Sequence, residues 1–300
     1  MENKSPKQAY SDDWKTSGYV LTNAVSSGAF MLLFIGLFLN HILEQPFMSV
    51  RPSAIYTGAI ISLVFLTITG FLLAKDIKDY PSFLRRLLNP THKTPFVNGA
   101  YAITIFGILT LLFAISISYN WRVLSIIFIY LTAFSAFSVS LYTSYLLGHH
   151  KKKHHWNSFA LSVHMLGHSL MAGGAAYSIV DAFYHIGTTW GFYVDMVLQV
   201  VILINLVVNV LEFMLTWQNS HQSDLVKEII SGKFSTLFWL GNVLIGNVIP
   251  FLIIFFTDLP LLQTVAGLGI IIGIYIIDKI WIDAPKYVNA RDRLSVINNS

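Results

Sequence analysis

The sequence contains no cysteine and few charged residues. Without cysteine, the 300 residues form no disulfide and supply no thiolate ligand to a metal or an iron–sulfur cluster. Only 11% of the residues are charged, whereas an ordinary soluble domain has about 25%. Hydrophobic residues make up 55% of the chain, and the mean hydropathy is +0.63. These proportions exclude an ordinary soluble domain and indicate a protein that faces lipid.

Long apolar runs hold most of the hydrophobic residues. About 20 residues, rising about 1.5 Å each, cross a hydrocarbon core of about 30 Å as an α-helix. We count eight such runs, at 19–41, 53–74, 97–118, 122–147, 157–181, 190–214, 235–257 and 261–281. A membrane barrel would instead show short segments of alternating polarity. The sequence therefore predicts an all-α integral membrane protein, a bundle of about eight transmembrane helices.

Polar segments flank the apolar part of the chain. Residues 1–18 carry charges of both signs and lack the order of a cleavable signal peptide, which is basic, then apolar, then small. We therefore expect the first apolar run to be a retained span. The expected organisation is a polar N-terminal segment over 1–18, a single helical bundle over 19–283 and a polar C-terminal tail over 284–300.

Basic residues are distributed unequally between the two expected sides of the membrane. Eight spans put both termini and the loops near 75–96, 148–156 and 215–234 on one side, with 17 of the 19 Lys and Arg residues. The positive-inside rule then predicts cytoplasmic termini in a multi-pass plasma-membrane protein. The run HHKKKHH at 149–155 fits such a loop, and a metal-binding tract is the less favoured alternative. Anionic lipid, rather than nucleic acid, explains the net positive charge.

Two histidines lie inside the fifth expected span. His164 and His168 are four residues apart, which places their rings on one helical face. An ionisable group at this depth costs at least about 2.5 kcal/mol on insertion scales, so it needs a partner or a role. The pair suits a proton relay or a contact with a quinone carbonyl. Two residues one turn apart on a single helix do not clamp both faces of a haem, and a structural role in helix packing stays open.

A polar stripe runs along the sixth expected span. At 100° per residue, five polar side chains fall within an arc of about 140°. They are Asp195, Gln199, Asn205, Asn209 and Glu212. The stripe is compatible with a proton pathway and equally with a seam of hydrogen bonds between helices. In the seventh expected span, Pro250 predicts a bend.

Three segments, in order along the chain, resemble the NrfD/PsrC family of quinone-interacting membrane subunits. DIKDYPSFLRRLLNPTHKTPFVNGAYAI at 76–103 is similar to the family segment that follows its second span. Residues 141–176 resemble its fourth and fifth spans, and FWLGNVLIGNVIPFLI at 238–253 resembles its F-W-x-G-x-x-x-x-G-x-x-x-P helix. The first segment departs from the family pattern at Ser82 and Asp79, where that pattern has arginines.

The resemblance implies a quinone- or quinol-binding subunit without haem or Fe–S cluster of its own. Such a subunit exchanges electrons with a ferredoxin-like Fe–S partner subunit and, through it, with a molybdopterin catalytic subunit. Reduction of a quinone moves two electrons and two protons, which suits amide, hydroxyl, imidazole and carboxylate groups. The implied residues are Asn23, Tyr142, Trp156 and His168 for quinone binding, and His164 and Asp76 for proton handling.

A secondary transporter or proton channel is the alternative function. In that case Asp195, Asn209 and Glu212 would line the pathway. Transporter folds often contain internal repeats or several broken helices. We find no repeat between 19–147 and 157–281, and only the seventh expected span has an interior proline. A proton-pumping quinone enzyme would combine both functions, and the polar stripe permits it.

Overall fold

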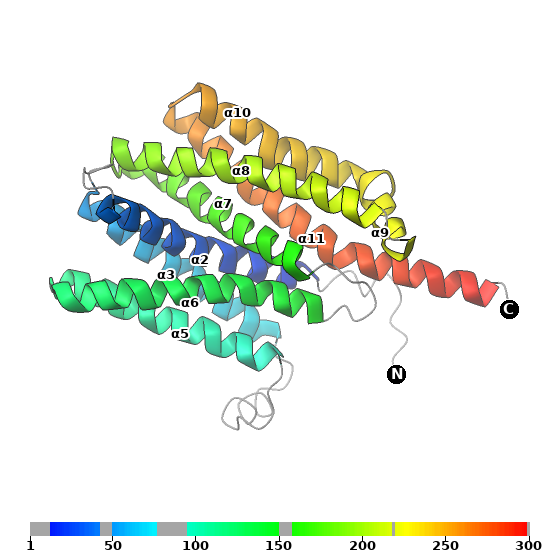
Figure 1. Cartoon of the computed structure of the whole chain (residues 1–300), viewed down its shortest axis with the longest axis horizontal. Coiled ribbons are helices and arrows are strands. Elements are labelled where there is room, and N and C mark those ends of the chain that lie inside the picture. The colour runs from blue at the N-terminus through cyan, green and yellow to red at the C-terminus, as the bar shows by residue number, and fades with distance from the viewer. Residues whose placement is uncertain (1–12, 43–49, 77–94, 150–157, 218–219, 299–300) are drawn as a thin grey trace.

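The structure is a computed structural model that describes residues 13–42, 50–76, 95–149, 158–217 and 220–298. Within these ranges the chain is helical and contains no strand (Figure 1). This confirms the predicted all-α fold. The helices are α2 (Asp13–Ile42), α3 (Pro52–Asp76), α5 (Pro95–Ser118), α6 (Arg122–His149), α7 (Ser158–Tyr184), α8 (Thr188–Trp217), α9 (Ser220–Ile230), η1 (Leu237–Val248), α10 (Ile249–Phe256) and α11 (Pro260–Asn298).

Seven helices of the described part are long and apolar enough to cross a membrane. They are α2, α3, α5, α6, α8, the continuous helix formed by η1 and α10, and α11. The chain is therefore a multi-pass membrane protein. Helix α7 is 27 residues long but falls outside this set, because histidine, serine and glycine lower its hydropathy. It packs against α2, α3, α6, α8 and α11, so other helices surround it (Figure 1).

Glycines bring the backbones of α2 and α7 into direct contact at the centre of the bundle. A Cβ atom at Gly28 would collide with the carbonyl oxygen of Ser169, and one at Gly173 would collide with the backbone of Gly28 and Ala29. Close approach through small residues is the usual way in which helices associate in lipid, where burial of apolar surface supplies little driving force. The two helices therefore cross this closely only because Gly28 and Gly173 have no side chains.

The seventh predicted span is not a regular α-helix. Residues 237–248 form a π-helix, in which the Ile249 N–H donates to the carbonyl oxygen of Leu244. Pro250, at the start of α10, has no N–H to continue the α-helical pattern. Gly246 meets Gly273 of α11 so closely that a Cβ on either residue would collide with the other backbone. The disturbance expected from Pro250 thus takes the form of π-helical winding against α11.

At the end of the bundle where α2 begins, α9 and the last part of α11 pack together (Figure 1). Arg291 of α11 bonds Glu228 of α9, with 2.6 Å between Nη1 and Oε1, and its Nη2 lies 3.7 Å from Asp224 Oδ2. Helix α11 continues through Pro285 to Asn298, where we expected a polar tail over 284–300. The α9 helix lies within a segment that the hydropathy pattern marks only as a loop.

We predict that the contact between α2 and α7 is sensitive to a single added methyl group. Gly173→Ala should destabilise the protein by about 1–3 kcal/mol, because the new Cβ must force two backbones apart. Gly70→Ala is the matched control, since a Cβ at Gly70 meets nothing within 4 Å. Thermal unfolding in detergent measures both variants. Equal unfolding midpoints for the two variants would contradict the proposed contact.

Candidate functional site

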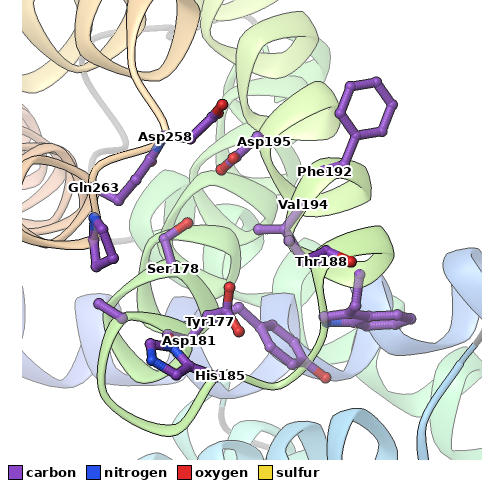
Figure 2. A pocket seen from close by; sticks show the side chains of 14 residues that line it. Tyr177, Ser178, Asp181, His185, Thr188, Phe192, Val194, Asp195, Asp258 and Gln263 are labelled. Carbon is purple, nitrogen blue, oxygen red and sulfur yellow. The ribbon is translucent and has the colours of Figure 1, made fainter.

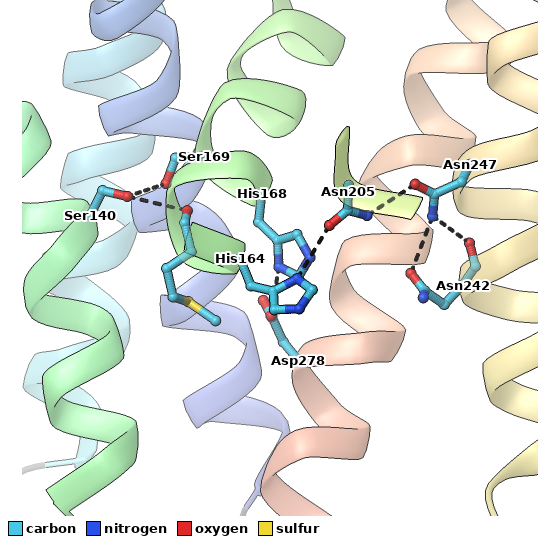
Figure 3. A network of polar contacts seen from close by, with 9 residues as sticks. Ser140, His164, His168, Ser169, Asn205, Asn242, Asn247 and Asp278 are labelled. Carbon is cyan, nitrogen blue, oxygen red and sulfur yellow. Dashed lines mark hydrogen bonds and ion pairs between the residues drawn. The ribbon is translucent and has the colours of Figure 1, made fainter. Parts of the chain in front are cut away.

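Polar side chains of three helices form a buried chain across the bundle (Figure 3). His164 Nδ1 on α7 lies 3.4 Å from Asn205 Oδ1 on α8. Asn205 Nδ2 donates to Asn247 Oδ1 at 3.1 Å, and Asn247 Nδ2 donates to the Asn242 carbonyl oxygen at 2.8 Å. All four residues are buried. The chain thus connects the histidine helix with the π-helical segment.

His168 faces a carboxylate that is as deeply buried as itself. Its Nδ1 lies 3.4 Å from Asp278 Oδ1 of α11, and the two side chains are 2% and 1% exposed. The indole of Trp281 stacks on the His168 ring, with centroids 5.3 Å apart, and meets the His164 ring edge-on at 5.0 Å. The pair is neutral overall in two states. In one, a neutral imidazole faces a protonated carboxyl group, and in the other an imidazolium faces a carboxylate. The pair can therefore hold one proton in either place.

A cluster of serine hydroxyls joins α2, α6 and α7 beside the histidines. Ser140 Oγ and Ser169 Oγ are 2.8 Å apart, and Ser27 Oγ lies 3.4 Å from Ser169 Oγ. Ser27 also donates to the carbonyl oxygen of Asn23 at 2.8 Å. Ser169 follows His168 directly on α7, but its hydroxyl faces Ser140, whereas His168 faces Asp278 (Figure 3). The serine hydroxyls can rotate to donate or accept a hydrogen bond.

Asn23 and Tyr142 line one small cavity, although they belong to α2 and α6. Asn23 Nδ2 donates to Thr143 Oγ1 at 3.0 Å. Asn23 Oδ1 and the Tyr142 hydroxyl are buried and make no hydrogen bond of good geometry with the described residues. The cavity measures about 20 Å³, which accommodates about one water molecule. Two of the residues that the family resemblance implies are therefore adjacent, in a cavity that is closed to a quinone ring.

The other residues implied by the resemblance divide into two groups. His164 and His168 lie in the buried network described above. Asp76 ends α3, but its side chain lies outside the described part of the structure, as does the whole of Trp156. The roles of Asp76 and Trp156 therefore stay predictions from the sequence.

The polar stripe of α8 separates into two sites. Asn205 and Asn209 are buried, and Asn205 belongs to the chain of asparagines. Gln199 Nε2 donates to the carbonyl oxygen of Ile254 at 3.3 Å. Asp195 lines a different cavity at the far end of the bundle (Figure 2), and the side chain of Glu212 is not described. Within the described residues, no hydrogen bond connects Asp195 with Asn205.

Asp278 is the residue that sequence reasoning missed. It lies near the end of the eighth apolar run, in the segment IIDKIWID, where a charged residue is easily taken for the membrane boundary. In the structure it is 1% exposed and faces His168. An acidic residue with a tryptophan three positions later, inside an apolar run, was the available signal. Nothing in the sequence of α11 indicates that its partner is a histidine on another helix.

The fold and the buried network define a class: a multi-pass helical membrane protein with an ionisable polar core. A scan against models of protein families finds no match, and a search of curated proteins finds no relative. Within the described residues, no group of three or more His, Asp or Glu side chains is placed to hold a metal ion. The resemblance to the NrfD/PsrC family stands on the sequence segments alone.

We predict that His168 and Asp278 are energetically coupled. Asp278→Leu and His168→Phe should each destabilise the protein, because each leaves a buried polar partner unmatched. The double variant should be less destabilised than the sum of the two, by about 0.5–3 kcal/mol. Chemical unfolding of the purified proteins in detergent gives the free energies of unfolding for this double-mutant cycle. A cycle of Asp195→Leu with His168→Phe is the control and should be additive, and additivity for both pairs would contradict the coupling.

Proposed function

We propose that the chain is the quinone- or quinol-reactive membrane subunit of an oxidoreductase complex. It would pass electrons between the quinone pool and a ferredoxin-like Fe–S subunit, and through that subunit to a molybdopterin catalytic subunit. The observation that carries this proposal is the pairing of Asn23 with Tyr142. The family resemblance selects both residues from distant parts of the sequence, and in the structure they line one buried cavity.

Two polar atoms at this cavity match what a quinone needs. A quinone carbonyl accepts a hydrogen bond and a quinol hydroxyl donates one. The Tyr142 hydroxyl can donate to a carbonyl, and Asn23 Oδ1 can accept from a hydroxyl. Both atoms lack a hydrogen bond of good geometry with the described residues. A ligand with oxygen atoms at both ends of a ring would satisfy both groups.

Binding a ring at this cavity requires a movement of Tyr142. A pocket for a small molecule has about 300 Å³ or more, whereas this cavity has about 20 Å³. The Tyr142 ring lies against the backbone of Gly99, so closely that a Cβ there would collide with it. Rotation of the Tyr142 ring away from Gly99 would enlarge the cavity, because this ring is part of its lining.

Reduction of the quinone takes up two protons along with two electrons. The His168–Asp278 pair would give these protons a place of storage within the bundle. His164 faces Asn205 of α8, with 3.4 Å between Nδ1 and Oδ1. This arrangement supports proton uptake coupled to the redox step.

The proposed topology has eight spans and cytoplasmic termini. We count α7 as the eighth span, because it is 27 residues long and neighbouring helices shield its polar residues from lipid. The start of α2 and the end of α11 lie at the same end of the bundle (Figure 1), as an even number of spans requires. The positive-inside rule places that end in the cytoplasm of a cell with this protein in its plasma membrane. The basic loops at this end would then receive the Fe–S partner.

A transporter or proton channel is the second candidate, and the π-helix favours it. Transporters often place ion sites at broken helices near the middle of the membrane. Here η1 contributes Asn242 and Asn247 to a chain of buried amides that reaches His164. Proton flux into liposomes, compared between wild type and Glu212→Gln, tests this candidate.

We predict that Tyr142→Phe impairs quinone turnover and leaves assembly intact. Loss of one hydrogen bond to a reacting oxygen, worth about 1.5–3 kcal/mol, should slow turnover by about tenfold to a hundredfold. Tyr145→Phe is the control, since Tyr145 is exposed on the same helix. The protein is purified from native membranes in mild detergent. Mass spectrometry of the partners, extraction of bound quinone and quinol oxidation are then measured for all three proteins.

The redox proposal fails if the wild-type chain purifies without an Fe–S partner and without quinone. It also fails if Tyr142→Phe and Tyr145→Phe turn over quinol at the wild-type rate. In the first case, loss of proton flux in Glu212→Gln would support the transporter.

A further inference from the structure

A second, larger cavity (Figure 2) lies where α7 ends and α8 begins, which is the end of the bundle opposite the start of α2 (Figure 1). Its volume is about 370 Å³, which lies within the range of small-molecule sites. The end of α7, the start of α8 and the turn between α10 and α11 form its walls. The proposed quinone site, at Asn23 and Tyr142, shares no lining residue with it.

The lining is strongly acidic. Asp181, Asp195 and Asp258 come from three different segments, and His185 is the one basic side chain among the lining residues. Arg51 stands nearby, against the backbone of Gly187 in the turn between α7 and α8. Asp181 Oδ1 accepts the Ile186 N–H at 2.5 Å, so part of this carboxylate serves the turn. The remaining carboxyl oxygens are available as hydrogen-bond acceptors around the cavity.

Two further acceptors in the lining have no donor. Ser178 is 7% exposed and Gln263 is 8% exposed. Ser178 Oγ and Gln263 Oε1 make no hydrogen bond with the described residues, although Gln263 Nε2 donates to the carbonyl oxygen of Thr257 at 2.8 Å. Figure 2 shows the oxygen atoms of Ser178 and Asp195 turned toward the same space. Buried acceptors of this kind are costly unless a donor reaches them.

We propose that this cavity binds a small primary amine in its ammonium form. An ammonium group brings positive charge to the three carboxylates and N–H donors to Ser178 and Gln263.

The same features argue against two other occupants. A bare metal ion needs several close ligands, and the described residues hold no group of three or more His, Asp or Glu side chains that fits one. A quaternary ammonium carries the charge but has no N–H to donate, so it would leave the Ser178 and Gln263 acceptors unmatched. The proposal therefore specifies a primary amine, with one or two ammonium groups.

The test is binding of 1,4-diaminobutane to the full chain in nanodiscs of phosphatidylcholine, by titration calorimetry. We expect saturable binding with a millimolar or lower Kd, and binding of tetramethylammonium that is at least about tenfold weaker. Asp195→Asn and Asp258→Asn should each weaken diaminobutane binding by at least about tenfold. Asp224→Asn is the control, because Asp224 is exposed on α9 at the other end of the bundle.

Three results would overturn the proposal: no saturable heat with diaminobutane, equal binding of tetramethylammonium, or unchanged binding in Asp258→Asn. Asp258 is exposed in a turn, so its variant should fold even if Asp195→Asn does not. The measurement uses neither quinone nor a partner subunit. Its outcome is therefore independent of the proposed redox function.

Discussion

The structure depends on one constraint: within a bilayer, polar groups of the chain must find their partners inside the protein. Helix α7 is where this constraint is strongest, because it carries His164 and His168 in the middle of its length. It is long enough to cross a membrane, but its most apolar stretch has a lower mean hydropathy than those of the other seven long helices. It packs against five other helices. Its neighbours supply the partners that lipid cannot, namely Asn205 from α8 and Asp278 from α11.

Close packing and polar contacts support each other around α7. The meeting of Gly28 with Gly173 brings α2 near enough for Ser27 to reach Ser169. On the other side, the meeting of Gly246 with Gly273 holds the π-helical segment against α11, and the same segment carries Asn242 and Asn247. Glycines thus set the distances at which hydroxyls, amides and imidazoles meet. The result is two buried polar clusters, one of serine hydroxyls beside Asn23 and one that runs from His164 to η1.

Hydropathy alone predicts the helices well and their partners poorly. The run at 19–41 corresponds to Asp13–Ile42 and the run at 122–147 to Arg122–His149, because membrane thickness fixes the length of a span. Hydropathy does not predict helix α9, since its 11 residues are too few and too polar for a membrane span. The continuation of α11 beyond residue 283 was also not predicted, because contacts with α9 on another part of the chain stabilise it.

The candidate site divides in the same way. Helical spacing correctly places His164 and His168 on one face, since both rings meet Trp281. Spacing on α8 groups Asp195 with Asn205, but neighbouring helices separate them into two environments. Asp278 was missed because its partner lies on another helix. The adjacency of Asn23 and Tyr142 came from the family resemblance, and no periodicity would have paired them.

The most direct measurement of the central claim is photolabelling of the protein in its native membranes with an azidoquinone, followed by peptide mapping. The quinone proposal predicts labels on α2 near Asn23 and on α6 near Tyr142, which an excess of unmodified quinone suppresses. Labels confined to other helices, or labels that excess quinone does not reduce, would contradict it.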